Sequence, residues 1–150
     1  MDFAHPEGII AFVTGQLPGA IVETADEASG APEIAWGDTF VFAGPEKQRM
    51  PFATIVTKDY PGFDTESRLD RPGVFRLNIG VGKATFTELL GYPPAEHAEH
   101  AAGVDYTAAD TLIPHPAYAI QAWIAFVCPG PNTTGLAASL LLATHAKAVS

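Results

Sequence analysis

From residue 20 to residue 79 the chain passes through one short β-type segment after another, with turns or loops between them and no helical pattern. A run of strands without intervening helices is typical of an antiparallel sheet. In the last strand the two-residue period places Arg76 and Asn78 on one face, which we expect to be half-exposed. The expected strands are 20–24, 33–36 and 39–43 as two arms around Gly37-Asp38, 52–57 and 74–79.

Helix signals stand on either side of this region. Pro6 suits the first position of a helix, and Pro18-Gly19 ends the apolar pattern that follows it. Thr85-Phe86-Thr87-Glu88 has the spacing of a capping box, and Gly91 is a natural C-terminal stop. The remaining expected elements are a short helix at 94–102, a buried strand at 120–127 and a final helix after Thr133 or Thr134, with an apolar stripe of Leu136, Leu140 and Ala143.

These elements predict one α+β domain over residues 1–150, with a mainly antiparallel sheet and helices packed on one face. The predicted element order is α-β-β-β-β-α-β-α. A length of 150 residues fits one domain, and 47% apolar residues suffice for its core.

Basic residues are segregated along the chain, whose net charge is −9. Residues 47–83 hold seven of the eight, against four acidic residues, for a net charge of +3. The negative total disfavours a general nucleic-acid coat protein, because phosphate binding needs a positive field. In one interpretation Arg68, Arg71 and Arg76 converge to hold an anion, since the guanidinium fork matches carboxylate and phosphate oxygens. In the other interpretation, residues 47–83, which we call the basic band, contain a solvated loop with local ion pairs.

Two motifs were weighed for cofactors and metals. The stretch 80–85 resembles a phosphate loop but lacks the first glycine and the Ser or Thr that would bind magnesium, so a tight turn is the better interpretation. His97, His100 and His115 could together hold zinc, but their spacing is a weak signal. We therefore expect no cofactor and no metal site.

His115 is a candidate acid–base, because prolines on both sides restrict its backbone; the alternative is a turn histidine bonded to the backbone. Large aromatic residues could wall a pocket for a planar ligand, although we expect Trp123 to lie in the core. The candidate catalytic residues are His115 and Asp38, and the candidate ligand-binding residues are Trp36, Lys58, Arg68, Arg71, Arg76 and Asn78.

A cytoplasmic protein without a membrane partner is expected from three features. Cys128 is the only cysteine, the first residues do not have the pattern of a secretory signal, and the apolar segments are shorter than a membrane helix. The most favoured partner is a small molecule, and a homodimer through an exposed apolar face stays open.

The C-terminal third carries a family resemblance. His115-Pro116-x-Tyr118-x-x-x-x-Trp123, followed by a strand, a proline turn and a closing helix, resembles the MmcQ/YjbR-like family of small α+β proteins. Nearly the whole chain is also similar to a group of bacterial proteins of unknown function. The resemblance to the MmcQ/YjbR-like family implies a CyaY-like fold and a double-wing DNA-binding role, although Ala119-Ile120-Gln121-Ala122 replaces the basic, Trp-containing stretch of that family. The stretches similar to the bacterial group are 32–40, 51–61 and 67–78.

The residues favour a protein that binds a small anionic or aromatic molecule, with His115 as the acid–base if it is a biosynthetic enzyme. Two alternatives remain. One is a DNA-binding or regulatory protein that uses the band 47–83, and the other is a protein-interaction module.

Overall fold

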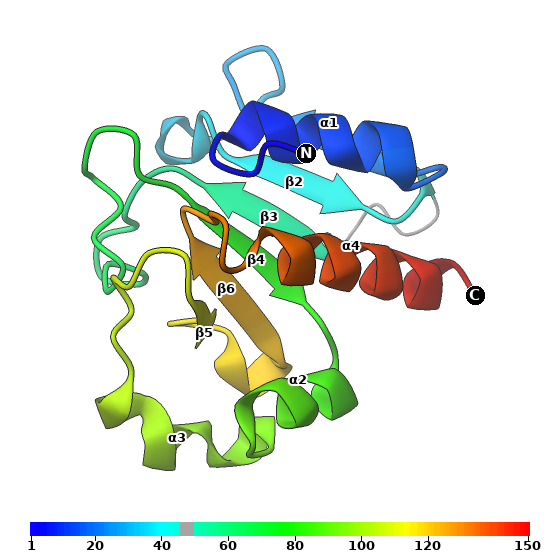
Figure 1. The fold of residues 1–150 in the computed structure, drawn as a ribbon. Helices are drawn as coiled ribbons and strands as arrows, with labels where there is room; N and C mark the ends of the chain where they lie inside the picture. Colours follow the sequence, from blue (N-terminus) through cyan, green and yellow to red (C-terminus); the bar gives the residue numbers. More distant parts are fainter. Residues whose placement is uncertain (46–49) are drawn as a thin grey trace.

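Six strands form one antiparallel sheet in the computed structural model of the chain, which describes residues 1–45 and 50–150 (Figure 1). Their order across the sheet is β1-β2-β3-β4-β6-β5, so the first four follow one another as a meander and β6 lies between β4 and β5. The predicted antiparallel sheet is confirmed. The strands are β1 (Ile21–Thr24), β2 (Thr39–Phe42), β3 (Ala53–Val56), β4 (Arg76–Gly80), β5 (Leu112–Pro114) and β6 (Trp123–Val127).

The two long helices lie across the same face of the sheet, and α2 and α3 lie near one end of it (Figure 1). We call the face under α1 and α4 the helix face and the opposite one the loop face. The predicted α+β class and the helices on one face are confirmed. The helices are α1 (Pro6–Gln16), α2 (Lys83–Leu90), α3 (His97–His100) and α4 (Thr134–Val149), with single turns η1 (Glu33–Ala35), η3 (Pro94–Glu96), η4 (Ala101–Gly103) and η5 (Ala119–Gln121).

The main core fills the space between the sheet and the two long helices. Leu77 and Ile79 of β4 belong to it and are fully buried. Ile9 and Val13 of α1 and Leu141 of α4 close the same cluster. Removing these apolar surfaces from water is the main force that holds the helices on the sheet.

Arg76 and Asn78 alternate with those core residues and face the other way, as the two-residue period predicts. The predicted half-exposed strand is wrong, because both side chains are 0% exposed. Two long loops cover the loop face: Asp64 and Ser67 from one bond to Arg76, and His115 from the other approaches it. Tertiary packing has therefore buried a face that its composition marks as polar.

Two local predictions are wrong in the N-terminal two thirds of the chain. The segment 33–36 is not a strand but the single turn η1, in which the amide of Trp36 donates to the carbonyl of Glu33. The capping box is not formed, since α2 begins at Lys83 with Gly82 as its N-cap. Gly82 has φ +91°, a conformation that glycine adopts without strain.

The other differences lie toward the C-terminus. Strand β5 was not predicted, because three residues between turns leave little periodicity, and β6 begins at Trp123 after η5. The stripe on α4 is placed wrongly. Leu136 and Ala143 are exposed, and the helix buries a neighbouring side that consists of Ala137, Ala138, Leu140, Leu141 and His145.

Among the helices in residues 1–45 and 50–150, none combines the length and the apolar character needed to cross a membrane.

Candidate functional site

A row of paired residues across the loop face forms the floor of a pocket. Strand register places Phe40 of β2 beside Thr54 of β3, Thr54 beside Asn78 of β4, and Asn78 beside Ala125 of β6. Side chains in such a row share one face of the sheet and lie within contact distance of their neighbours. The meander thus brings a ring, a hydroxyl and an amide side by side.

The pocket above this floor consists of two adjoining hollows of about 430 and 460 Å³, which share Phe40, Thr54, His115 and Tyr118. We call them together the loop-face pocket. Each hollow has the size typical of small-molecule sites. Its aromatic residues are Phe40, Tyr60, Phe63, Tyr118 and Trp123, and its polar residues include Thr54, Asp64, Arg76, Asn78 and His115.

Arg76 is the centre of the polar part of the pocket. Its Nη1 donates to Asp64 Oδ1 at 3.0 Å and its Nη2 to Asp64 Oδ2 at 2.5 Å, so the ion pair is bidentate. Nη1 also donates to Ser67 Oγ at 3.1 Å, and Nε donates to Asn78 Oδ1 at 2.7 Å. Arg76 is fully buried and Asp64 is 6% exposed, so the charges compensate each other out of water.

His115 lies on the loop after β5 and is 3% exposed. Its Nδ1 accepts hydrogen bonds from the backbone amides of Ala117 at 2.9 Å and Tyr118 at 3.0 Å. Burial and the neighbouring Arg76 charge lower the pKa of His115 to about 3, against a partial opposing effect of Asp64. The imidazole is therefore neutral at neutral pH.

Asp38 lies behind the pocket and is completely buried. Its Oδ1 accepts from Lys58 Nζ at 3.0 Å and from the Thr57 amide at 2.9 Å, and its Oδ2 accepts from the Tyr60 hydroxyl. Burial and the hydrogen bond to Asp38 raise the pKa of Tyr60, which therefore stays protonated. Asp38 does not line the pocket and would influence it only through Tyr60.

Neither tryptophan lies where it was expected. Trp36 does not line the pocket, because its indole Nε1 donates to the carbonyl of Ala31 at 2.9 Å, and its own carbonyl accepts from Lys58. Trp123, expected in the core, is half-buried and lines the pocket. Its indole lies against Gly80, where an added Cβ would come within 2.7 Å of Trp123 Cε2. Glycine at 80 is thus required by this close approach.

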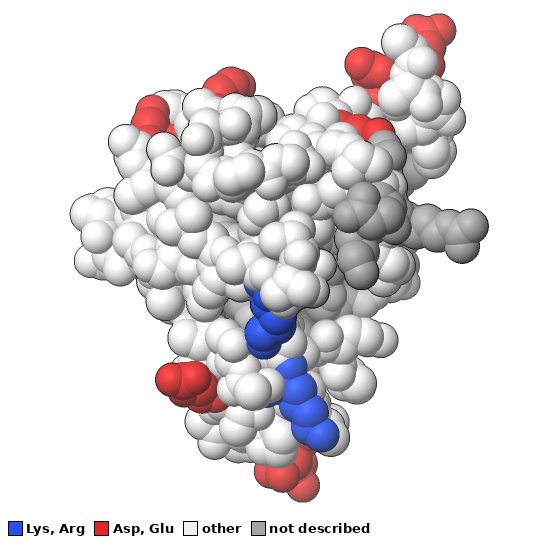
Figure 2. Space-filling view, turned by 90° about the vertical axis from the view of Figure 1, so that its right-hand side faces the viewer, with Lys and Arg blue, Asp and Glu red and all other residues white. Residues whose placement is uncertain are grey.

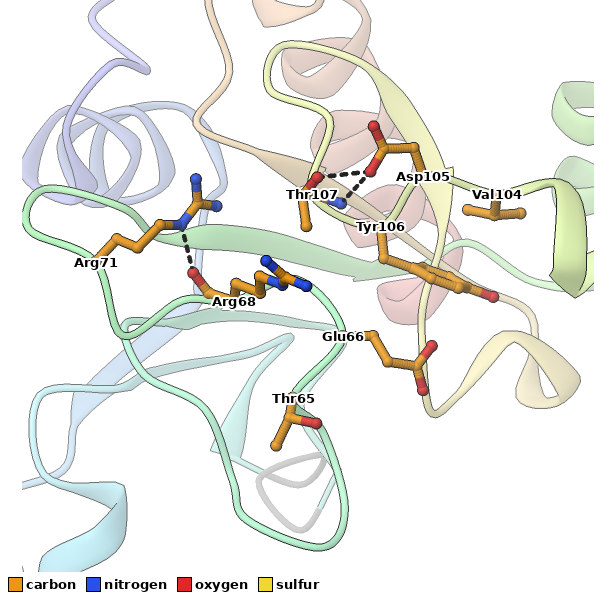
Figure 3. Close-up of a pocket in the computed structure, with 8 residues that line it drawn as sticks. All are labelled: Thr65, Glu66, Arg68, Arg71, Val104, Asp105, Tyr106 and Thr107. Atoms are coloured by element: carbon orange, nitrogen blue, oxygen red, sulfur yellow. Dashed lines mark hydrogen bonds between the residues drawn. The ribbon is translucent and has the colours of Figure 1, made fainter.

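The predicted convergence of three arginines is wrong. Arg68 and Arg71 line a separate hollow of about 750 Å³, together with residues 104–107 (Figure 3). Arg71 Nε donates to the Arg68 carbonyl at 2.6 Å, and its Nη2 donates to the Ser67 carbonyl at 3.1 Å. Arg68 and Arg71 are exposed, whereas the loop-face pocket has four buried polar residues, Asp64, Arg76, Asn78 and His115. We therefore take the smaller loop-face pocket, not this larger hollow, as the candidate site.

The described members of the basic band 47–83 do not form one continuous exposed surface, since Arg76 is fully buried. Two of its members are bound in ion pairs, Lys58 with Asp38 and Arg76 with Asp64. Lys47 and Arg49 lie outside the described residues. The face shown in Figure 2 has its basic side chains close together in its lower half, with acidic side chains toward the edges.

The three histidines weighed for zinc do not come together. His97 is held between the hydroxyls of Tyr92 and Tyr106, and burial lowers its pKa. His115 lies in the loop-face pocket instead. In the described part of the chain, the residues close enough to share a metal ion are Glu96, Glu99 and His100, all exposed. Exposed groups of this kind are common on protein surfaces and carry no metal site by themselves.

Of the predicted site residues, Arg76, Asn78 and His115 lie together in the loop-face pocket, with Asp38 and Lys58 behind it. The residue patterns did not single out Asp64, Thr54 or Tyr118. Thr54 could have been found, since its strand position pairs it with Asn78. The sequence signal for Asp64 was weaker and consisted only of its position in a loop that is unusually long for a compact domain.

A family model described as "Family of unknown function (DUF6194)" matches residues 4–150, which is nearly the whole chain. No curated protein and no solved structure matches. The resemblance to MmcQ/YjbR-like proteins stays a prediction, since this match does not bear on it.

Proposed function

Since the chain belongs to the DUF6194 family, whose function is unknown, we propose a role from the loop-face pocket: it binds a small aromatic molecule. The observation that carries this proposal is the aromatic wall around a buried polar floor. Binding sites for small molecules typically combine apolar walls with a few placed polar groups.

The exposed aromatic rings support an aromatic ligand. Phe63 is 57% exposed and Tyr118 is 41% exposed, and their ring centroids lie 5.6 Å apart. Tyr118 also contacts the rings of His115 and Trp123, at 4.9 and 6.4 Å. Rings in this arrangement can take another ring into the same cluster, in the offset or tilted geometries that aromatic pairs prefer.

The electrostatics favour binding over acid–base catalysis by His115. Nδ1 is engaged by two backbone amides, and the low pKa keeps the ring neutral. A general base needs a free nitrogen lone pair, and a general acid works best with a pKa near the working pH. His115 instead suits a fixed hydrogen-bond donor.

The test uses N-phenylnaphthylamine, an uncharged aromatic probe whose fluorescence rises in apolar surroundings. Wild-type protein is expected to bind it with saturation, and Tyr118→Ala to bind it about tenfold more weakly, because one ring of the wall is gone. Leu142→Ala is the matched control, since Leu142 is 44% exposed on α4 at the opposite face. Absence of saturable fluorescence, or equal loss in both variants, would contradict the proposal.

A further inference from the structure

The tautomer of His115 decides which hydrogen-bonding groups the loop-face pocket offers a ligand. Two backbone N–H groups, from Ala117 and Tyr118, point at Nδ1, so this nitrogen must carry the lone pair. The proton of the neutral ring is then on Nε2. This atom lies 3.4 Å from Arg76 Nη2, which is also a donor. The two groups that face each other here are therefore both hydrogen-bond donors.

A count of the Arg76 hydrogens gives the same result. A guanidinium has five N–H groups. One is used by Asn78, two by the oxygens of Asp64 and one by Ser67 Oγ. The fifth, on Nη2, is the one toward His115, and within the described residues neither it nor the His115 Nε2–H has an acceptor once the tautomer is assigned.

A third donor comes from the adjacent position on the floor. Asn78 Nδ2 donates to Thr54 Oγ1 at 3.0 Å, which leaves the Thr54 hydroxyl hydrogen free to turn elsewhere. Thr54 lines both hollows of the loop-face pocket. The nearby acceptors, Asp64 and Asn78 Oδ1, are already engaged by Arg76. The polar part of the loop-face pocket therefore presents hydrogen-bond donors to a ligand.

The formal charges at the site cancel. Arg76 is paired with Asp64, Lys58 with Asp38, and His115 is neutral. A carboxylate placed here would bring an uncompensated negative charge into a largely buried site, which is costly. An uncharged oxygen would accept the same hydrogen bonds without that penalty.

From this arrangement, and on the basis of the proposed function, we infer that the ligand carries an uncharged carbonyl oxygen that accepts from His115 Nε2–H, which the facing Arg76 donor leaves without an acceptor. The ligand class is an aromatic ketone, aldehyde, ester or amide. Aliphatic amines are poor ligands, because they are protonated at neutral pH and would bring a positive charge and further donors next to the Arg76 and His115 donors.

The experiment displaces N-phenylnaphthylamine with four naphthalenes of matched shape: a methyl ketone, a carboxylate, an aminomethyl compound and an ethyl compound. The ketone is expected to compete about tenfold better than the ethyl compound, since it gains the hydrogen bond from His115 Nε2–H. Failure of the fluorescent probe itself to bind overturns the proposed function. Saturable probe binding with equal competition by ketone and ethyl compound, or with the amine or carboxylate best, overturns only this inference.

Two further measurements test the inference, and the first depends neither on ligand choice nor on a variant. Nitrogen NMR of the free protein is expected to show His115 with a protonated Nε2 and an unprotonated Nδ1, and the reverse tautomer would overturn the inference. Thr54→Val keeps the side-chain shape and removes the hydroxyl, which is both a free donor and the acceptor of Asn78 Nδ2. It is expected to weaken the ketone about threefold relative to the ethyl compound, and an unchanged ratio would remove Thr54 from the donor set.

Discussion

The two faces of β4 differ in almost every physical respect, although their residues alternate along one strand. On the helix face, Leu77 and Ile79 join a continuous apolar core under α1 and α4. On the loop face, Arg76 and Asn78 are equally buried but belong to a hydrogen-bonded network. Its other members lie in loops that are distant in the sequence. Apolar burial tolerates many arrangements of similar volume, whereas a buried charge requires a particular partner. The loop face is therefore the more specific part of the molecule, and the place where a ligand can be recognised.

The largest effect is expected from breaking the network on the loop face. Asp64→Ala leaves the Arg76 guanidinium buried without its counter-charge, and the free energy of unfolding should fall by about 4 kcal/mol. Urea unfolding followed by circular dichroism measures it. Glu66→Ala, an exposed carboxylate in the same loop, is the control and should change stability by less than about 0.5 kcal/mol. A loss in Asp64→Ala no greater than in this control would show that the ion pair is not needed.

The corresponding change on the helix face should be smaller and of a different kind. Leu77→Ala opens a cavity in the core and should lower the free energy of unfolding by about 3 kcal/mol. Because Leu77 faces away from the pocket, the affinity of the variant for N-phenylnaphthylamine should stay unchanged under conditions in which the variant is folded. A variant that folds but binds the probe tenfold more weakly would mean that the two faces are coupled.

A still smaller effect is expected from pH, and it arises on the loop face. The unfolded chain protonates His115 near its ordinary pKa of 6.5, whereas the folded protein does so only near 3. Below pH 6.5 the unfolded state binds the proton and the folded state does not, so the stability is lost as pH falls toward 3. Between about pH 7.5 and about pH 5 this group alone should remove about 2 kcal/mol.

Urea unfolding at a series of pH values tests this, with His115→Gln as the control. The other histidines remain in that variant, so the difference between the two slopes belongs to His115. Parallel slopes for wild type and His115→Gln would show that the folded protein does not depress this pKa.

Much of the fold could be predicted because its signals are local. The alternation in 74–79 correctly separated Arg76 and Asn78 from the core residues, and Pro6 correctly marked the start of α1. The errors lie where local signals compete. Thr85 with Glu88 has the spacing of a capping box with Thr85 as the N-cap, but the observed N-cap is Gly82, three residues earlier.

The candidate site was predicted only in part, and the physical reason is the range of its contacts. Arg68 and Arg71 are near Arg76 in the sequence, yet Arg76 takes its partner Asp64 from 12 residues away and meets His115 from 39 residues away. Arg71 turns to backbone carbonyls of its own loop. Charge type and sequence proximity therefore could not say which arginine would be buried.

The sequence by itself determined the antiparallel sheet, the helices that precede and follow the run of strands along the chain, and the face to which each residue of β4 points. These features follow from backbone periodicity and turn chemistry. Only the tertiary structure decided that the polar face is buried and that Asp64 neutralises Arg76. Those features depend on two loops that fold over the sheet. Their conformation is set by long-range hydrogen bonds and burial, to which no short sequence pattern corresponds.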